Sequence, residues 1–178
     1  GAAEGIWKIG VEPVYIVKGG YHIWLPVKEF LESDVYFLEA NADTTLTEPG
    51  STRDAMTISY YNSVDNSIDI NSGRGYTRCT ILKPDFAVPG VEITGLSLDG
   101  RFVERSGSSA SVGIAAGSAA LIMEWLGKQP AVRGITCSQV RNIILFGTNQ
   151  REDMDYPNKE WGYGTIDIYQ SLNRLREL

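Results

Sequence analysis

The chain has 178 residues, and 16 Lys and Arg against 22 Asp and Glu give a formal net charge of −6. Hydrophobic residues make up 43% and charged residues 21%, a globular balance that excludes wholesale disorder. The negative charge argues against a nucleic-acid partner, and the longest apolar run, 112–123, falls short of the roughly 18 residues of a membrane span. We therefore expect no nucleic acid and no membrane as partners.

Residues 1–50 have the pattern of short β-strands separated by turns. The runs that fit strands lie at 7–11, 14–17, 21–25 and 34–39. Such runs are typical of a β-sandwich or jelly roll, and four strands would not close one, so the segment looks incomplete. The single histidine, His22, lies in one of these runs. A His-rich metal site is thus excluded, and a place on a sheet face is favoured for His22 over a role as a catalytic base.

The pattern becomes mixed α/β after Pro49 and Gly50. Residues 55–60 predict a buried strand, 62–75 a polar loop, and 91–94 a second strand.

The strongest predicted helix covers residues 108–125, which contain no proline. Gly113 and Gly117 lie inside it, although an interior glycine costs a helix about 0.5–1 kcal/mol relative to alanine. Together with several alanines they form a small-residue surface. We therefore expect another element to pack very close to this helix, between a sheet and neighbouring helices.

Two further helices are predicted from their caps. Thr136 and Gln139 have the capping-box spacing, apolar residues follow, and Gly147 is a natural stop. Asp167 has the same capping role for a last helix that ends near Arg176.

The cysteines and the acidic run 151–155 give no cofactor. Cys79 and Cys137 lie far apart and outside any C-x-x-C pair, which disfavours structural zinc. Free cysteines are commonly buried, so we expect two thiols in or near the core. The irregular spacing of oxygen ligands in 151–155 favours a solvated loop over a calcium site.

The start of the 108–125 helix carries the candidate chemistry. Gly107, Ser108 and Ser109 stand where unpaired N–H groups and the positive end of the helix dipole favour a developing oxyanion. Taken alone the feature is weak, because serine is also a common helix N-cap.

Three motifs occur in order along the chain: K-P-D and P-G within 83–90, G-S-S opening the run 107–121, and G-Y-G-T-I-D at 162–167. This succession resembles the C-terminal half of the subtilisin-like serine proteases, the subtilases. Their pattern reads K-P-D-x-x-A-P-G, then G-T-S-x-A-x-x-x-x-A-G-x-x-A-L, then G-x-G-x-[VI]-[DN]. The resemblance implies an α/β fold for 51–178, with a parallel sheet and helices on both faces.

Residues 1–50 resemble the C-terminal part of a β jelly roll inserted in one branch of the subtilases. That branch includes spore-germination proteases. The resemblance therefore implies two domains, 1–50 and 51–178, and an extracellular or spore-associated location. It also raises calcium as a family ligand without assigning residues to it.

By this resemblance Ser109 is the nucleophile of a serine endopeptidase, and its own N–H is one oxyanion donor. Ser108 replaces the usual threonine and Val88 the usual alanine, and neither change removes the nucleophile. Asp85 is expected to be structural, bonding backbone or pairing with Lys83.

The D-x-G and H-G-T segments that carry the family's Asp and His do not occur in this sequence. Nor is the oxyanion asparagine assigned. A serine without a general base is a weak nucleophile, so we expect the chain alone to be inactive. The implied partners are a polypeptide substrate and the N-terminal half of the same protease.

Two other interpretations stay open. The chain is alternatively a pseudoprotease or regulatory partner of an active protease, or a β-sandwich interaction module with a fortuitous motif match. A helix from Ser108 buried against a parallel sheet would exclude the module. Exposed apolar surface along the strands at Ile58 and Val91 would mark a missing half.

Overall fold

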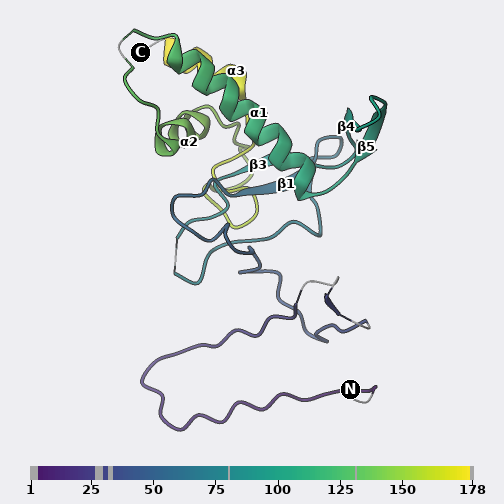
Figure 1. Ribbon diagram of the computed structural model, residues 1–178. Helices are drawn as coiled ribbons and strands as arrows, with labels where there is room; N and C mark the ends of the chain where they lie inside the picture. Colours follow the sequence, from purple (N-terminus) through teal and green to yellow (C-terminus); the bar gives the residue numbers. More distant parts are fainter. Residues whose placement is uncertain (1–3, 27–29, 32–33, 80, 131, 177–178) are drawn as a thin grey trace. The chain divides into compact units, whose positions relative to one another are not determined.

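The computed structural model describes residues 4–26, 30–31, 34–79, 81–130 and 132–176, in two compact units, Gly1–Ala40 and Asn41–Leu178 (Figure 1). The second unit begins ten residues ahead of the predicted boundary at 50/51. Residues 41–45 belong to it because Thr45 N–H donates to the Arg74 carbonyl at 2.9 Å. The assignment of 1–50 to an inserted jelly roll stays a prediction.

The predicted strands at 7–11, 14–17, 21–25 and 34–39 are wrong for the described part of the first unit, which contains no strand. The alternation is present, but a strand forms only when a neighbour pairs with its N–H and C=O groups. His22 is exposed and stacks on Trp24, with ring centroids 5.2 Å apart. It therefore lies on no sheet face in this structure.

The second unit contains every helix and strand among the described residues (Figure 1). They are β1 (Ile58–Asn62), β2 (Ser67–Ile68), β3 (Phe86–Pro89), β4 (Ile93–Leu96), β5 (Phe102–Arg105), α1 (Ser108–Gly127), α2 (Cys137–Phe146) and α3 (Ile168–Arg176). The two predicted strands and three predicted helices are confirmed, with ends shifted by a few residues.

β1 is the middle strand of the larger sheet, which has the order β2-β1-β3. β1 and β3 are parallel, with Ile58 opposite Phe86. The other edge of β3 is bonded by residues 162–166, since Ala87 N–H donates to the Gly164 carbonyl and Ile166 N–H to the Ala87 carbonyl, both at 2.9 Å. The third motif thus pairs with the second edge of β3, the strand that lies within the first motif.

The hydrophobic core lies between this sheet and the helices. Phe86 and Val88 of β3 pack against Ile122 of α1 and Ile144 of α2. The opposite face, with Tyr61 and Ala87, is covered by residues of the 154–161 loop, Trp161 foremost. Hence α1, α2 and α3 all contribute to the cluster on one face, whereas the family resemblance implied helices on both.

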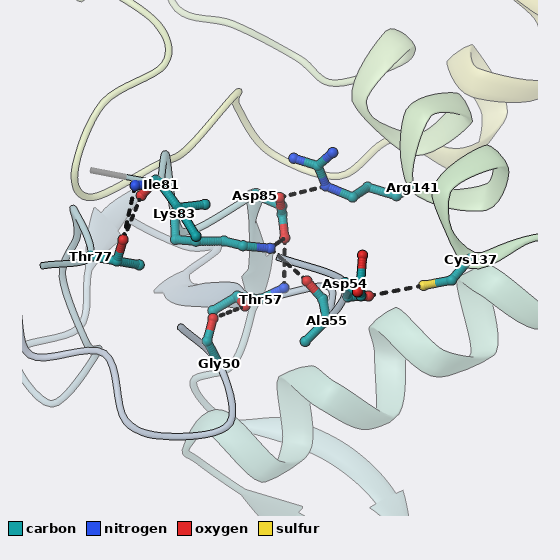
Figure 2. A network of polar contacts seen from close by, with 10 residues as sticks. All are labelled: Gly50, Asp54, Ala55, Thr57, Thr77, Ile81, Lys83, Asp85, Cys137 and Arg141. Carbon is teal, nitrogen blue, oxygen red and sulfur yellow. Dashed lines mark hydrogen bonds and ion pairs between the residues drawn. The ribbon is translucent and has the colours of Figure 1, made fainter. Parts of the chain in front are cut away.

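A buried ionic network fixes the N-terminal end of β3 (Figure 2). Asp85 is fully buried and accepts from Lys83 Nζ and from Thr57 N–H, each at 2.7 Å. Its other oxygen accepts from Arg141 Nε of α2 at 2.6 Å. The predicted structural role of Asp85 and its pairing with Lys83 are confirmed. One carboxylate thereby joins β1, β3 and α2.

Both cysteines are exposed, so the expectation of core thiols is wrong. Cys137 is the first residue of α2, on the surface, with its Sγ 3.5 Å from the Asp54 carbonyl (Figure 2). Cys137 is exposed because it begins a helix on the surface. Composition and spacing alone do not show where a cysteine lies along a helix.

Candidate functional site

Ser109 lies in the first turn of α1 and is exposed. Gly107, the residue before the helix, has φ 128° and ψ 171°. This backbone conformation is open to glycine and costly for other residues. The glycine of the G-S-S motif is therefore required by the turn that brings the chain from β5 into α1.

The segment 89–92 holds this turn through three hydrogen bonds. Gly107 N–H donates to the Gly90 carbonyl at 2.7 Å. The Ser111 hydroxyl donates to the Pro89 carbonyl at 2.9 Å, and the Ser106 hydroxyl accepts from Glu92 N–H at 2.9 Å. The end of β3 thus contacts the chain on both sides of Ser109.

Gly90 fits here because a side chain would not. A Cβ at this position would lie 2.1 Å from Ser111 Oγ and 2.7 Å from Tyr60 Cβ. Burial, with a hydrogen bond to Asp69, raises the pKa of Tyr60 to about 12. The phenol next to this turn therefore stays neutral at physiological pH.

The first N–H groups of α1 are available to a ligand. Within the described part of the chain, no acceptor bonds the N–H of Ser108 or Ser109, and no acidic residue occupies the first turn. Such groups at the positive end of a helix dipole stabilise negative charge. The arrangement can therefore hold an oxyanion beside the Ser109 hydroxyl.

The third motif has structural tasks. At Gly164, φ is 126°, and a Cβ would lie 2.3 Å from the Asn149 carbonyl oxygen. Asp167 caps α3, accepting from Gln170 N–H at 2.8 Å. Burial opposes ionisation of Asp167, but its hydrogen bonds from Gln170 and Asn149 outweigh burial and lower the pKa of its carboxyl group.

The structure brings no catalytic partner to Ser109 within the residues it describes. Neither an imidazole nor a carboxylate is hydrogen-bonded to its hydroxyl there, and no group of three or more metal-ligating side chains occurs in that part. In the acidic run, Asp153 is engaged by Arg151 in a two-pronged ion pair, at 3.0 and 2.6 Å.

The small-residue surface of α1 is exposed. A Cβ added at Gly113 or Gly117 would meet nothing within 4 Å. Val112, Leu121 and Met123 nearby are about half exposed, at 53, 56 and 48%. The expected close packing on this surface is therefore wrong within the described residues. Ile58 and Val91 themselves are partly buried, but Leu96 at the end of β4 is 70% exposed, so apolar surface is exposed along the strand that follows Val91.

Sequence reasoning missed Ser106 and Ser111 and their contacts with 89–92. A signal existed for Ser111, because the subtilase pattern G-T-S-x-A has alanine at that place. A buried serine in place of alanine needs a hydrogen-bond acceptor. Here the acceptor is the Pro89 carbonyl, which belongs to the first motif.

The structure is thus an α/β arrangement in which a helix packs on a parallel pair of strands and carries an exposed serine and unpaired N–H groups in its first turn. The family model described as Peptidase_S8: Subtilase family matches residues 32–164. The chain belongs to the subtilase family.

Solved subtilisin-like structures share this fold. The Clostridium perfringens CspB protease superposes with a TM-score of 0.74 at 24% identity, over 79% of this chain and 31% of that chain. The prenylagaramide maturation protease PagA gives 0.59 at 21%, over 75% of this chain and 47% of that chain. The self-cleaved protease domain of PatA gives 0.57 at 20%, over 77% and 47%.

The present chain spans less than half the length of each of these three structures. No curated protein sequence matches it. The β-sandwich module is excluded for residues 41–178, since α1 packs on the parallel pair β1 and β3.

Among the described residues, α1 is long and apolar enough to cross a membrane by length and composition only, with a mean hydropathy of 1.4. Its buried side belongs to the subtilase core. The expectation of no membrane partner stays a prediction.

Proposed function

We propose that this chain carries the nucleophile of a subtilisin-like serine endopeptidase, and that Ser109 is that nucleophile. The observation that supports this most directly is the exposed Ser109 in the first turn of α1, beside N–H groups with no acceptor in the described residues. Family membership supplies the reaction class, and the implied substrate is a polypeptide.

In the proposed reaction, Ser109 Oγ attacks the carbonyl carbon of the scissile bond while its proton passes to an imidazole base. The N–H of Ser109 donates to the oxyanion that forms. The intermediate collapses to an ester on Ser109, and the imidazolium gives its proton to the leaving amine. Water, activated by the same base, then releases the acyl group.

The base, its aspartate and the oxyanion asparagine are proposed to come from the N-terminal half of the same protease. Two observations support a complementing half. The apolar face of α1 around Gly113, Gly117 and Leu121 is exposed in this chain. The superposed part of this chain also covers only 31% of the CspB chain and 47% of the PagA chain. Calcium binding and a spore-associated or extracellular location remain proposals from the family resemblance.

Labelling by a fluorophosphonate probe tests the proposal. We expect negligible labelling of the chain alone, because loss of a triad member lowers kcat by about 10⁴ or more. Addition of the N-terminal half should give labelling and peptide hydrolysis that Ser109→Ala abolishes and Ser118→Ala, a change in the same helix, leaves intact.

Two results would contradict it. Turnover by the chain alone that depends on Ser109 would refute the need for a second half. Assembly of the two halves with no labelling of Ser109 would favour the alternative, a pseudoprotease that regulates an active enzyme.

A further inference from the structure

The contacts between 89–92 and 106–111 form a continuous set around Ser109. In chain order, the Ser106 hydroxyl accepts from Glu92 N–H, Gly107 N–H donates to the Gly90 carbonyl, and the Ser111 hydroxyl donates to the Pro89 carbonyl. The two segments therefore run past each other with one bond before the turn, one at the turn and one inside the helix. Ser108 and Ser109 lie between the last two.

The inner contact is buried and tightly fitted. Ser111 is 0% exposed, so its hydroxyl could not exchange the Pro89 carbonyl for water. The absence of a side chain at Gly90 makes room for this hydroxyl. A hydroxyl bonded inside a close-packed contact restricts both rotation and translation of the first helical turn.

The outer contact supports a strained residue. Glu92 has φ 53°, a left-handed conformation that costs a residue with a side chain free energy. Its N–H is bonded by the Ser106 hydroxyl. Such strain persists when the surroundings impose it, and here the bond ties it to the residue just before Gly107.

We propose that segment 89–92 fixes the position of the turn 106–111, which carries the proposed nucleophile Ser109, and we call this segment the seat. Ser106 and Ser111 are then positioning residues for Ser109. They act through the backbone of Gly107 and the first turn of α1, which fixes where the Ser109 hydroxyl and N–H point. The role in catalysis rests on the proposed function. The seat itself is a property of this chain and can be measured without activity.

Amide hydrogen exchange on the whole chain tests the seat. Ser111→Ala should speed exchange at Gly107 and Ala110 about 2- to 10-fold, the factor that one intramolecular hydrogen bond accounts for. Ser106→Ala, at an exposed position, should speed exchange at Glu92 by a similar factor with little risk to folding. Ser118→Ala, in the same helix, should leave all these amides at the wild-type rate.

A second readout separates positioning from a merely structural role. In the complemented enzyme, Ser111→Ala should lower kcat and the rate of probe labelling about 2- to 10-fold, while KM stays close to that of Ser118→Ala.

The outcomes distinguish the two proposals. Wild-type exchange rates in both Ser111→Ala and Ser106→Ala would overturn the seat. Faster exchange in the variants, with no labelling of the wild-type Ser109 in the complemented enzyme, would support the seat and refute the proposed function. Faster exchange with unchanged kcat would overturn the positioning role of Ser111.

Discussion

At the scale of single residues, the buried ion pairs of Asp85 show which contacts can be predicted from neighbouring residues in the sequence and which cannot. The pairing of Lys83 with Asp85 could be predicted from the K-P-D motif, because the two side chains are neighbours on the chain. Arg141, the third member, could not be predicted, since it comes from α2 and nothing in its own surroundings indicates an acceptor in β3. Ser106 was missed for the same reason, whereas Ser111 could have been noticed as a departure from the alanine of the subtilase pattern.

Removing the Asp85 carboxylate should be strongly destabilising. Asp85→Ala leaves the buried Lys83 ammonium and the Arg141 guanidinium without their counter-charge, and breaking a buried pair in this way costs about 3–5 kcal/mol. Denaturant unfolding measures the loss. Asp153→Ala is the control, because solvent screens its exposed pair with Arg151, and such pairs contribute little to stability. Equal losses in the two variants would show that the buried network is not the stabilising feature.

At the scale of elements, helices were predicted well and the N-terminal strands were not. Helix ends depend on caps within one turn of chain, and the Thr136 capping box and the Gly147 stop are both present. A strand depends on a partner that its own sequence does not specify. Residues 7–11 have the alternation of a strand, but they form no strand in this structure.

The α2 cap gives a prediction at this scale. Thr136 accepts from Gln139 N–H at 3.2 Å and its own N–H donates to the Gln139 side chain at 2.8 Å. Thr136→Ala should therefore lower the free energy of unfolding by about 1 kcal/mol. Ser138→Ala, an exposed change within the same helix, should cost less than about 0.5 kcal/mol. A cost at Thr136 no greater than at Ser138 would mean that the capping box adds nothing to α2.

At the scale of the whole molecule, three ordered motifs were enough to predict the family and the α/β class. Each motif has a position in the structure: the first anchors β3, the second begins α1, and the third closes the outer edge of β3. What composition could not show is which surface is left uncovered. Exposed apolar side chains lie on α1, where Leu121 is 56% exposed, and also on β4 and β5, where Leu96 and Phe102 are 70 and 76% exposed.

Substitutions at two adjacent residues of α1, Leu121 and Ile122, can distinguish the stability of this chain from its assembly with the N-terminal half. Ile122 is fully buried, so Ile122→Ala should lower the free energy of unfolding of this chain by about 2–5 kcal/mol. Leu121 is 56% exposed, and Leu121→Ala should change it by less than about 0.5 kcal/mol. With the N-terminal half, however, Leu121→Ala should weaken binding, as measured by calorimetry. Unchanged binding would place the complementing surface elsewhere.

The place of β3 between β1 and residues 162–166 has a consequence for synthesis. The ribosome releases β1 and β3 early, yet the second edge of β3 waits for a segment near the C-terminus. Until that segment emerges, β3 presents an unpaired edge of apolar residues, the kind of surface that recruits strands from other chains. Premature termination ahead of Gly162 would make that edge permanent. The closing glycine motif thus covers an edge prone to aggregation once the chain is complete, in addition to shaping the finished fold.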